Sequence, residues 1–375
     1  MFIHKLQNIF RLGCKELWSL WRDPIMLLLI TYTFTMSIYT GASSMPESLN
    51  NAPIGIVDED HSALSERVSS AFYPPLFTPF ETQLDQMDAG MDAGLYSFSM
   101  TIPSRFQEDI LANRGATVQV NVDATRVTQA LTGSSYIQQI ILTEVNSYLQ
   151  GHRSVTSLPV DLELRARFNP TLDRQWFGGI MQVINNVTML SIILTGAALI
   201  REREHGTVEH LLVMPVTVFE IMMAKVWSMG LVVLVASFVA VHLVVKGFMH
   251  IPIEGNLWLF FLGASLSLFA TTSLGIYMAT VAKSMPQFGL LMMLVLIPLQ
   301  MLSGGLTPRE SMPEVVQNIM QFAPTTHFVN LAQAILYRNA GFDVVWMPFL
   351  CLFAIGAVFF YFALKRFKET IHTMT

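Results

Sequence analysis

Six blocks of mostly apolar residues alternate with polar segments along the chain. A helix that crosses a bilayer needs about 20 predominantly apolar residues, and most of these blocks reach that length. The pattern therefore predicts an α-helical polytopic membrane protein with six transmembrane helices. The predicted spans cover residues 25–43, 177–200, 226–246, 257–281, 288–303 and 344–364.

The segment before the first span has a helical pattern of its own. Apolar residues recur at helical spacing between Leu6 and Trp21, and basic residues such as Lys5 and Arg22 accompany them. A signal peptide would have only a short basic start, so residues 1–24 are predicted to form an amphipathic N-terminal interfacial helix before an uncleaved span. The small residues at 41–43 leave cleavage of a signal peptide as the alternative.

Residues 44–175 contain no block that resembles a span, and their pattern predicts an extracytoplasmic (periplasmic) α/β domain. The acidic run Asp58–Asp60 is predicted to form a capped turn, because an EF-hand needs glycine where Ala63 stands. The repeated MDAG at 87–94 is predicted to be a loop or the start of a helix. Strands are expected at 52–57, 96–102 and 117–122, and helices at 62–72, 104–113 and 128–150.

The distribution of Lys and Arg predicts the orientation in the membrane. With both termini in the cytoplasm, the short inner segments next to the spans hold eleven Lys and Arg residues, and the short outer loops hold three. Positively charged residues concentrate on the cytoplasmic side of membrane proteins. We therefore expect a multi-pass protein with cytoplasmic termini, a cytoplasmic tail at 366–375, and residues 44–175 outside.

Composition agrees with a membrane protein and excludes several other classes. The chain is 52% hydrophobic and 13% charged, with a mean hydropathy of +0.48, whereas soluble chains carry about 25% charged residues. A net charge of −5 gives no basic field for nucleic acid. The two cysteines, Cys14 and Cys351, exclude a disulfide framework.

The sequence lacks the motifs that would make the chain an enzyme. No G-x-x-x-x-G-K-[ST] motif is present, so we predict that the chain does not hydrolyse ATP itself. His205 and His210 are five residues apart, whereas zinc-binding helices place their histidines four apart on one face. We therefore predict no catalytic, cofactor-binding or metal-binding residues in this chain.

The predicted inner loop at 201–225 has an unusual composition. The charged residues Arg201–Glu204 are followed by the apolar residues Leu211–Met214 and then by Pro215. Such a loop can present a short surface helix to a cytoplasmic partner. The alternative is a helix at the membrane edge, whose charged side chains merely end the span.

Polar residues interrupt the second predicted span. Gln182, Asn185, Asn186 and Thr188 lie in a helix that is otherwise apolar, and polar side chains inside a membrane face protein or a pathway rather than lipid. Hydrogen bonding between helices and contact with a substrate are the two interpretations, and the first is favoured.

A glycine-rich turn follows the fifth predicted span. Ser303, Gly304 and Gly305 precede short helical pieces that are too interrupted to cross a membrane. They could shape an outer gate, or they could serve as a structural cap.

Several short motifs resemble those of a known family. They are RDP at 22–24, ERE-x-GT-x-E-x-L at 202–211, SGG at 303–305, MP at 312–313 and PTTHF at 324–328. With the order of interfacial helix, span, outer domain and five clustered spans, the chain resembles the type-2 ABC exporter permeases, the ABC-2 transporter family. The resemblance covers essentially the whole chain, and the motif of the inner loop is the specific part.

This resemblance implies a permease subunit of the bacterial inner membrane that couples ATP hydrolysis in a partner to efflux of an unidentified, amphipathic or drug-like substrate. ATP and Mg would be used by the partner ABC ATPase and not bound by this chain. The other implied partners are a second permease protomer in a homodimer or heterodimer, the lipid bilayer, a periplasmic adaptor protein and an outer-membrane channel.

The resemblance also assigns roles to residues. Asn185, Asn186 and Thr188 would lie at the translocation pathway. Ser303, Gly304 and Gly305 are candidates for the outer gate from the interrupted helical pattern alone, with the structural cap as the equal alternative. The ATPase-coupling loop would use Arg201, Glu202, Glu204, Gly206, Thr207, Glu209 and Pro215.

Two other functions remain as alternatives. A membrane receptor with a ligand-binding outer domain would need a cytoplasmic output domain, and 11 residues follow the last predicted span. A membrane-embedded enzyme would need a nucleophile, a metal cluster or an acid pair in the spans, and the spans show none.

Overall fold

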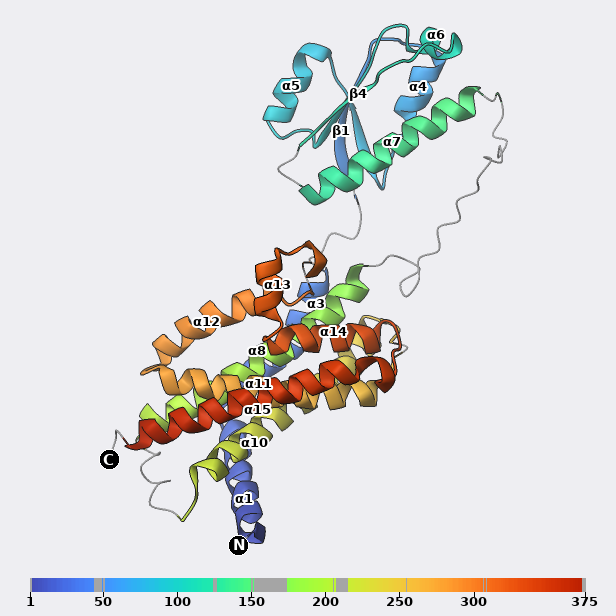
Figure 1. Cartoon of the computed structure of the whole chain (residues 1–375). Coiled ribbons are helices and arrows are strands. Elements are labelled where there is room, and N and C mark those ends of the chain that lie inside the picture. Colours follow the sequence, from blue (N-terminus) through green and yellow to red (C-terminus); the bar gives the residue numbers. More distant parts are fainter. Residues whose placement is uncertain are drawn as a thin grey trace. The chain divides into compact units, whose positions relative to one another are not determined.

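The chain folds into two compact units (Figure 1). One comprises Met1–Met45 and Ala166–Thr375 and is called here the membrane unit; the other comprises Pro46–Arg165 and is called the α/β domain. The computed structural model describes residues 2–43, 49, 51–123, 127–149, 151, 174–204, 206, 215–253, 255–305, 307 and 309–372.

The membrane unit is helical throughout its described elements. Within the described residues, five helical stretches are long and apolar enough to cross a membrane: Pro24–Ser43, Gln175–Glu204, Val218–Phe248, Leu257–Val281 and Phe342–Glu369. The block predicted as a further span corresponds to α12, which has 17 residues, so the count of six spans stays a prediction. The helices are α1 (Phe2–Trp21), α2 (Pro24–Phe34), α3 (Met36–Ser43), α8 (Arg174–Glu204), α10 (Val218–Val239), the π-helix η2 (Ala240–Phe248), α11 (Leu257–Val281), α12 (Met285–Met301), the 3-10 helix η3 (Arg309–Ser311), α13 (Glu314–Met320), α14 (Pro324–Leu336) and α15 (Phe342–His372).

Two stretches differ from the predicted spans for local reasons. α10 begins eight residues before the expected position 226, because Thr217 and Glu220 form a capping box that starts the helix at Val218. The first span is divided at Thr35 into α2 and α3. The Thr31 and Thr35 hydroxyls donate to carbonyls four residues back, and such bonds bend helices.

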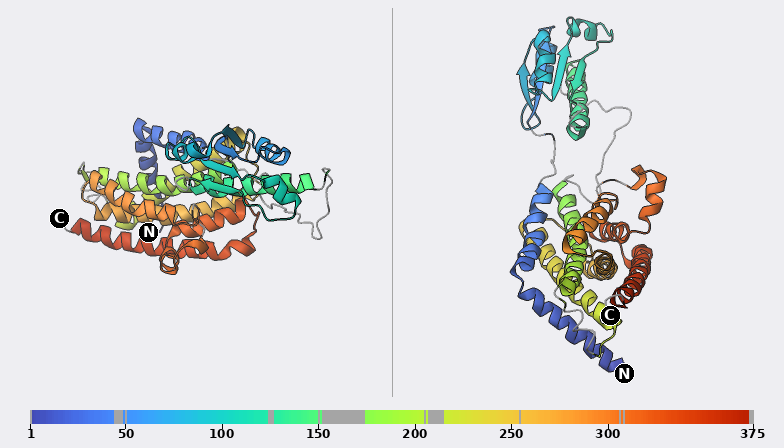
Figure 2. Two further views of the ribbon diagram at one scale, coloured as in Figure 1. Left: turned by 90° about the horizontal axis from the view of Figure 1, so that it is seen from above. Right: turned by 90° about the vertical axis from the view of Figure 1, so that its left-hand side faces the viewer.

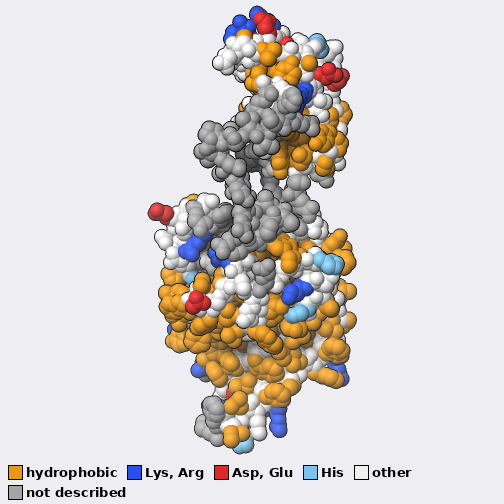
Figure 3. Space-filling model, turned by 90° about the vertical axis from the view of Figure 1, so that its right-hand side faces the viewer, with side chains coloured by type: hydrophobic (Ala, Val, Ile, Leu, Met, Phe, Trp, Pro, Cys, Tyr) orange, Lys and Arg blue, Asp and Glu red, His pale blue; other side chains and the backbone are white. Residues whose placement is uncertain are grey.

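Small residues allow α11 to pack closely against α8 and α15, its neighbours in Figure 1. A Cβ on Gly275 would lie 2.9 Å from the Ile192 carbonyl oxygen of α8, so glycine is required for this approach. The Ser191 hydroxyl donates to Thr271 Oγ1 across the same interface at 2.6 Å. Hydrophobic side chains cover most of the face of this unit seen in Figure 3. Such a surface suits a lipid environment.

The α/β domain is built on a four-stranded sheet of order β2-β1-β3-β4. β1 (Ala52–Asp58) pairs in parallel with β2 (Phe77–Glu81) and β3 (Phe98–Ile102), and β4 (Gln119–Val122) pairs antiparallel with β3. The domain's helices are α4 (Ala63–Ser70), α5 (Leu84–Asp92), α6 (Phe106–Leu111) and α7 (Val127–Leu149).

Helices cover both faces of this sheet. Ile54, Ile56 and Met100 point to the face whose core includes residues of α4, α6 and α7. On the opposite face, the hydroxyls of Ser99 and Thr101 lie against methionine sulfurs of α5. The alternation of side chains along β1 and β3 thus matches a strand buried on both sides.

Most local elements of the α/β domain agree with their predicted positions, and two do not. The strand β2 was not predicted because Pro79 interrupts its pattern; proline is tolerated here because β2 is an edge strand. The segment 87–94 was expected to be a loop or a helix start, but α5 continues through it to Asp92. The predicted capped turn is present, with Ser62 as the N-cap of α4.

Substitution of Gly133 by alanine is expected to destabilise the α/β domain by about 1–3 kcal/mol through overpacking. A Cβ at this position of α7 would overlap the Phe98 ring on β3, so the helix or the ring must move. Thermal unfolding of the purified chain would measure the loss. Gly115→Ala is the matched control, because a Cβ there meets nothing within 4 Å. Equal melting of both variants would contradict this packing.

Candidate functional site

The C-terminal end of α8 carries charged residues that join three helices. The Glu202 carboxylate lies 2.7 Å from Lys225 Nζ on α10 and 3.1 Å from Lys15 Nζ on α1. Lys225 Nζ also lies 3.1 Å from the Glu16 carboxylate on α1. We call Lys15, Glu16, Glu202 and Lys225 the ion-pair cluster. It connects α1, α8 and α10 through side chains.

Burial makes this cluster sensitive to the loss of its buried members, Lys225 and Glu16. Lys225 is 1% exposed and Glu16 is 7% exposed. Two cations and two carboxylates give a formally neutral group, which is the condition under which buried charges are tolerated. Burial raises the pKa of Glu16 above its ordinary value, although the nearby Lys225 acts in the opposite direction.

A second ion pair lies beside the cluster. Arg201 Nη1 is 2.6 Å from the Asp23 carboxylate, which also accepts a hydrogen bond from the Met26 amide and so caps the N-terminus of α2. Burial alone would raise the pKa of Asp23, but the hydrogen bonds from Met26 and Arg201 outweigh it and lower that pKa. This pair ties the end of α8 to the start of the first span.

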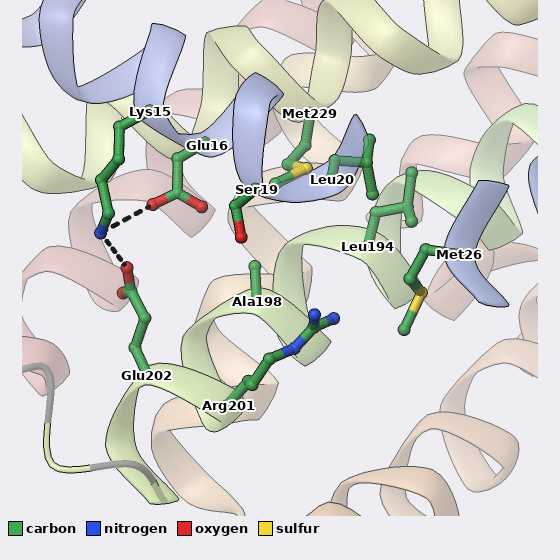
Figure 4. A pocket seen from close by; sticks show the side chains of 10 residues that line it. All are labelled: Lys15, Glu16, Ser19, Leu20, Met26, Leu194, Ala198, Arg201, Glu202 and Met229. Atoms are coloured by element: carbon green, nitrogen blue, oxygen red, sulfur yellow. Dashed lines mark hydrogen bonds and ion pairs between the residues drawn. The ribbon is translucent and has the colours of Figure 1, made fainter. Parts of the chain in front are cut away.

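A cavity of about 200 Å³ lies between these helices (Figure 4). Lys15, Glu16, Arg201 and Glu202 line one part of it, and apolar side chains such as Leu194 line the rest. In Figure 4 the Lys15 ammonium lies between the carboxylates of Glu16 and Glu202. The charged groups are therefore turned toward their partners inside the membrane unit.

Aromatic and polar contacts hold α1 against α10. The Phe10 ring stacks on the Trp227 ring at 5.8 Å, and Trp227 Nε1 donates to the Ile9 carbonyl at 3.2 Å. A Cβ on Gly13 would overlap the same indole ring, so glycine permits this close contact. Figure 2 shows α1 running at an angle to the helices of the membrane unit.

Several apolar side chains of α1 are exposed. Trp18 and Trp21 are 60% and 71% exposed, and Leu6 is 53% exposed. Exposed apolar side chains on an amphipathic helix suit the boundary of a bilayer. The interfacial location of this helix stays a prediction.

The structure gives three predicted coupling residues partners within the chain. Arg201 and Glu202 form the ion pairs above, and the Glu204 carboxylate accepts a hydrogen bond from the Met285 amide at 3.0 Å. Arg201 and Glu202 are thus engaged in ion pairs within the chain, and Glu204 is exposed and accepts one amide hydrogen bond. Their contact with an ATPase stays a prediction.

The other predicted coupling residues are less constrained by contacts. Gly206 forms a turn with φ of +69°, and Pro215 is exposed. Thr207 and Glu209 lie outside the described residues.

Sequence reasoning missed the partners in this site, namely Glu16, Asp23 and Lys225. Lys225 offered a signal, because a lysine within an apolar helix requires a counter-charge. Glu16 offered another, as it is the one acidic residue in α1. Neither signal identified which residues would meet.

The polar residues of α8 differ in their surroundings. Asn186 Nδ2 donates to the Thr33 carbonyl at 2.6 Å, and its Oδ1 accepts from Gln182 Nε2 at 3.2 Å. The Thr188 hydroxyl donates to the Ile184 carbonyl and is buried. Asn186 bonds to another helix and Thr188 bonds within α8, in line with the favoured interpretation of packing. A place for Asn185, Asn186 and Thr188 at a pathway between protomers stays a prediction, and Asn185 is half-buried.

The predicted gate residues form a tight turn at the end of α12. The Ser303 hydroxyl donates to the Gln300 carbonyl at 2.8 Å, and Gly304 has a φ of +93°. A Cβ on Gly305 would overlap the Met181 side chain of α8. These contacts account for the glycines structurally, so the role as a cap is sufficient to explain them.

Substitution of Asp23 by alanine is expected to destabilise the membrane unit by about 1–2 kcal/mol, because it removes both a helix cap and an ion pair. Asp23→Asn should cost less, since asparagine can still cap α2.

The stability of the membrane unit should also depend on pH through Asp23. The native pKa of Asp23 is lowered, so its ionised form stabilises the fold above the ordinary aspartate pKa of about 3.9. This contribution is lost as the pH falls through the native pKa. Thermal unfolding in detergent between pH 3 and 7, with exposed Asp88→Ala as control, measures the effect; equal melting of all three variants would refute it.

The long apolar helices of the membrane unit are those of a polytopic membrane protein. Sequence comparison gives its family. Residues 24–365 match the family described as ABC-2 family transporter protein. The chain therefore belongs to the ABC-2 family of transporter permeases.

Its relatives include named permeases of one bacterium. The chain is 62% identical over 370 residues to the inner membrane transport permease YhhJ of Escherichia coli K12, covering 98% of this chain and 99% of that protein. It is 27% identical over 365 residues to the probable multidrug ABC transporter permease YbhR of the same organism, covering 94% and 95%. These findings favour a multi-pass inner-membrane transporter subunit over the receptor alternative.

Proposed function

We propose that the chain is the membrane subunit of an export system driven by a separate ABC ATPase, which binds ATP and Mg. The observation that carries this proposal is the ion-pair cluster at the end of α8, where Glu202 is both a member of the cluster and the first residue of the family motif. A loop that receives a force from a partner needs a rigid connection to the spans, and the cluster supplies one.

The proposed coupling runs from the loop at 201–215 into three helices. A displacement of the end of α8 moves Glu202, which is bound to Lys225 of α10 and Lys15 of α1. Arg201 moves Asp23 and with it the start of α2. Buried ion pairs resist separation because each charge would be left without a partner in a medium of low dielectric constant.

The loop itself would make the ATPase contact. Thr207 and Glu209 are the positions that carry this contact in the proposal, since the neighbouring Arg201 and Glu202 are engaged within the chain. Pro215 ends the loop and is exposed, where a partner can reach it.

The proposal also includes the orientation in the membrane, the further partners and the substrate. The termini would face the cytoplasm and the α/β domain the periplasm, with an adaptor protein and outer-membrane channel as its partners. Two protomers would form the pathway, with Asn185 as a candidate contact. The name of YbhR says that it is a probable multidrug permease, which supports an amphipathic or drug-like substrate here.

Crosslinking in the native membrane tests this function. The tagged chain would be crosslinked, purified and analysed by mass spectrometry for proteins joined to residues 201–215. Recovery of a protein with an ATP-binding cassette is the expected result. Contacts of this loop with lipid or a signalling protein alone would contradict the proposal and return the receptor alternative.

A further inference from the structure

The α/β domain contains an apolar pocket between its edge strand and its longest helix. The pocket has a volume of about 410 Å³. Val118, Val120 and Val122 line one wall, and Ile137, Ile141 and Val145 line the other. This volume lies within the range of about 300–1,000 Å³ that small-molecule sites occupy.

Polar contacts hold α7 toward α4 and α6. Its Glu144 carboxylate forms an ion pair with Arg67 of α4 at 2.6 Å, and its Tyr148 hydroxyl donates to Gln107 of α6 at 3.1 Å. Among the described residues, the pocket lies on the side of α7 that faces β4, which forms an end of the sheet.

The chemistry of the walls indicates what would fill the space. No charged side chain lines the pocket among the described residues, and the two polar ones, Ser134 and Gln138, stand one turn apart on α7. Ordered water needs several polar partners, which most of this surface cannot provide. Leu142 remains 54% exposed at the same face, so apolar surface is left uncovered.

The charge of the surrounding domain narrows the choice further. The α/β domain, residues 46–165, holds fifteen acidic residues, six arginines and no lysine, a formal charge of −9. An acidic domain disfavours an anionic amphiphile near its surface. Apolar walls with two neutral hydrogen-bonding groups instead fit an uncharged molecule that has one long apolar part and a small polar end.

We propose that this pocket binds an uncharged amphiphile, with its apolar chain between β4 and α7 and its polar end at Ser134 and Gln138. The proposal concerns binding by the α/β domain and holds whether or not the chain couples to an ATPase. It adds a ligand site that the transport proposal does not require.

Photolabelling of the full chain in lipid nanodiscs tests the site. The probe is a long-chain primary alcohol with a diazirine in its chain, and the labelled peptides are identified by mass spectrometry. Labelling of peptides from 116–122 and 134–145 is expected, with labelling of the membrane helices as an internal reference. Absence of label from these two peptides, with the helices labelled, would overturn the proposal.

Three variants distinguish binding inside the pocket from labelling of the general surface. Val120→Trp should fill the pocket and reduce labelling of 134–145 by about tenfold, which corresponds to about 1.4 kcal/mol. Gln119→Trp places the same side chain on the opposite face of the strand and should leave the label unchanged. Ser134→Leu narrows the pocket from the other wall. Unchanged labelling in both pocket variants would refute the site.

A second probe with a charged head group tests whether the ligand is uncharged. A diazirine fatty acid of the same length should label the two peptides less than the alcohol does, because its carboxylate meets an acidic domain. Equal labelling by the acid would overturn the assignment of an uncharged ligand.

Discussion

Substitution of Lys225 by methionine is expected to destabilise the membrane unit by about 3–5 kcal/mol, a large effect for one residue. Lys225 is fully buried and forms ion pairs with both Glu16 and Glu202. Methionine has a similar length but no charge, so two carboxylates would be left close together without their buried cation. The melting temperature and the amount of folded chain in detergent, measured by fluorescence-detected size exclusion, would report the loss.

Controls distinguish the ion pairs from simple loss of a lysine. Lys283→Met removes an exposed lysine at the start of α12 and should change stability by less than about 0.5 kcal/mol. Combining Lys225→Met with Glu16→Gln and Glu202→Gln removes the buried charges and leaves only the exposed Lys15, so it should restore much of the stability. If Lys225→Met melts with the wild-type chain, the cluster does not hold these helices together.

Substitution of Glu209 by lysine is expected to abolish transport while the chain stays folded in the membrane. Glu209 belongs to the loop motif, and the resemblance to the ABC-2 family places it at the ATPase. Reversal of a charge in such a contact typically costs about 2–5 kcal/mol, equivalent to a loss of about 30-fold or more in affinity. Copurification of the ATPase and efflux of a fluorescent amphipathic dye from cells would measure the two effects.

A matched charge reversal elsewhere provides the control. Glu314 is exposed at the start of α13, and Glu314→Lys should retain both the ATPase and dye efflux. The melting temperature of Glu209→Lys should equal that of the wild-type chain, because the ion-pair cluster keeps all four of its residues. Transport by Glu209→Lys at the wild-type rate would count strongly against ATPase coupling through this loop.

The spans were largely predictable because each depends on a local run of apolar residues. The expected helix at 257–281 coincides with α11. The start of α10 was less predictable, because a capping box of Thr217 and Glu220 begins the helix before its apolar run. The strand β2 escaped prediction because its tolerance for Pro79 depends on a place at the edge of the sheet, which no local pattern reveals.

The candidate site was predictable in its location but not in its contacts. The charged run at the end of α8 marked the loop, yet Glu202 meets Lys15 at a separation of 187 residues, and Glu16 meets Lys225 at a separation of 209. Similarly, hydrogen bonding between helices was the favoured interpretation of Asn186, but only the structure identifies the Thr33 carbonyl as its partner.

The sequence by itself determined that this chain is a membrane protein, where most of its helices and strands lie, and which short motifs connect it with a family of permeases. Hydrophobicity and local periodicity act over a few neighbouring residues, so these properties can be read along the chain. Only the tertiary structure decided which charges are paired, which polar side chains are used in packing, and where the α/β domain leaves a pocket. Those properties depend on how helices and strands distant in sequence rotate and pack against one another, because a side chain's partner is set by the face that its element presents.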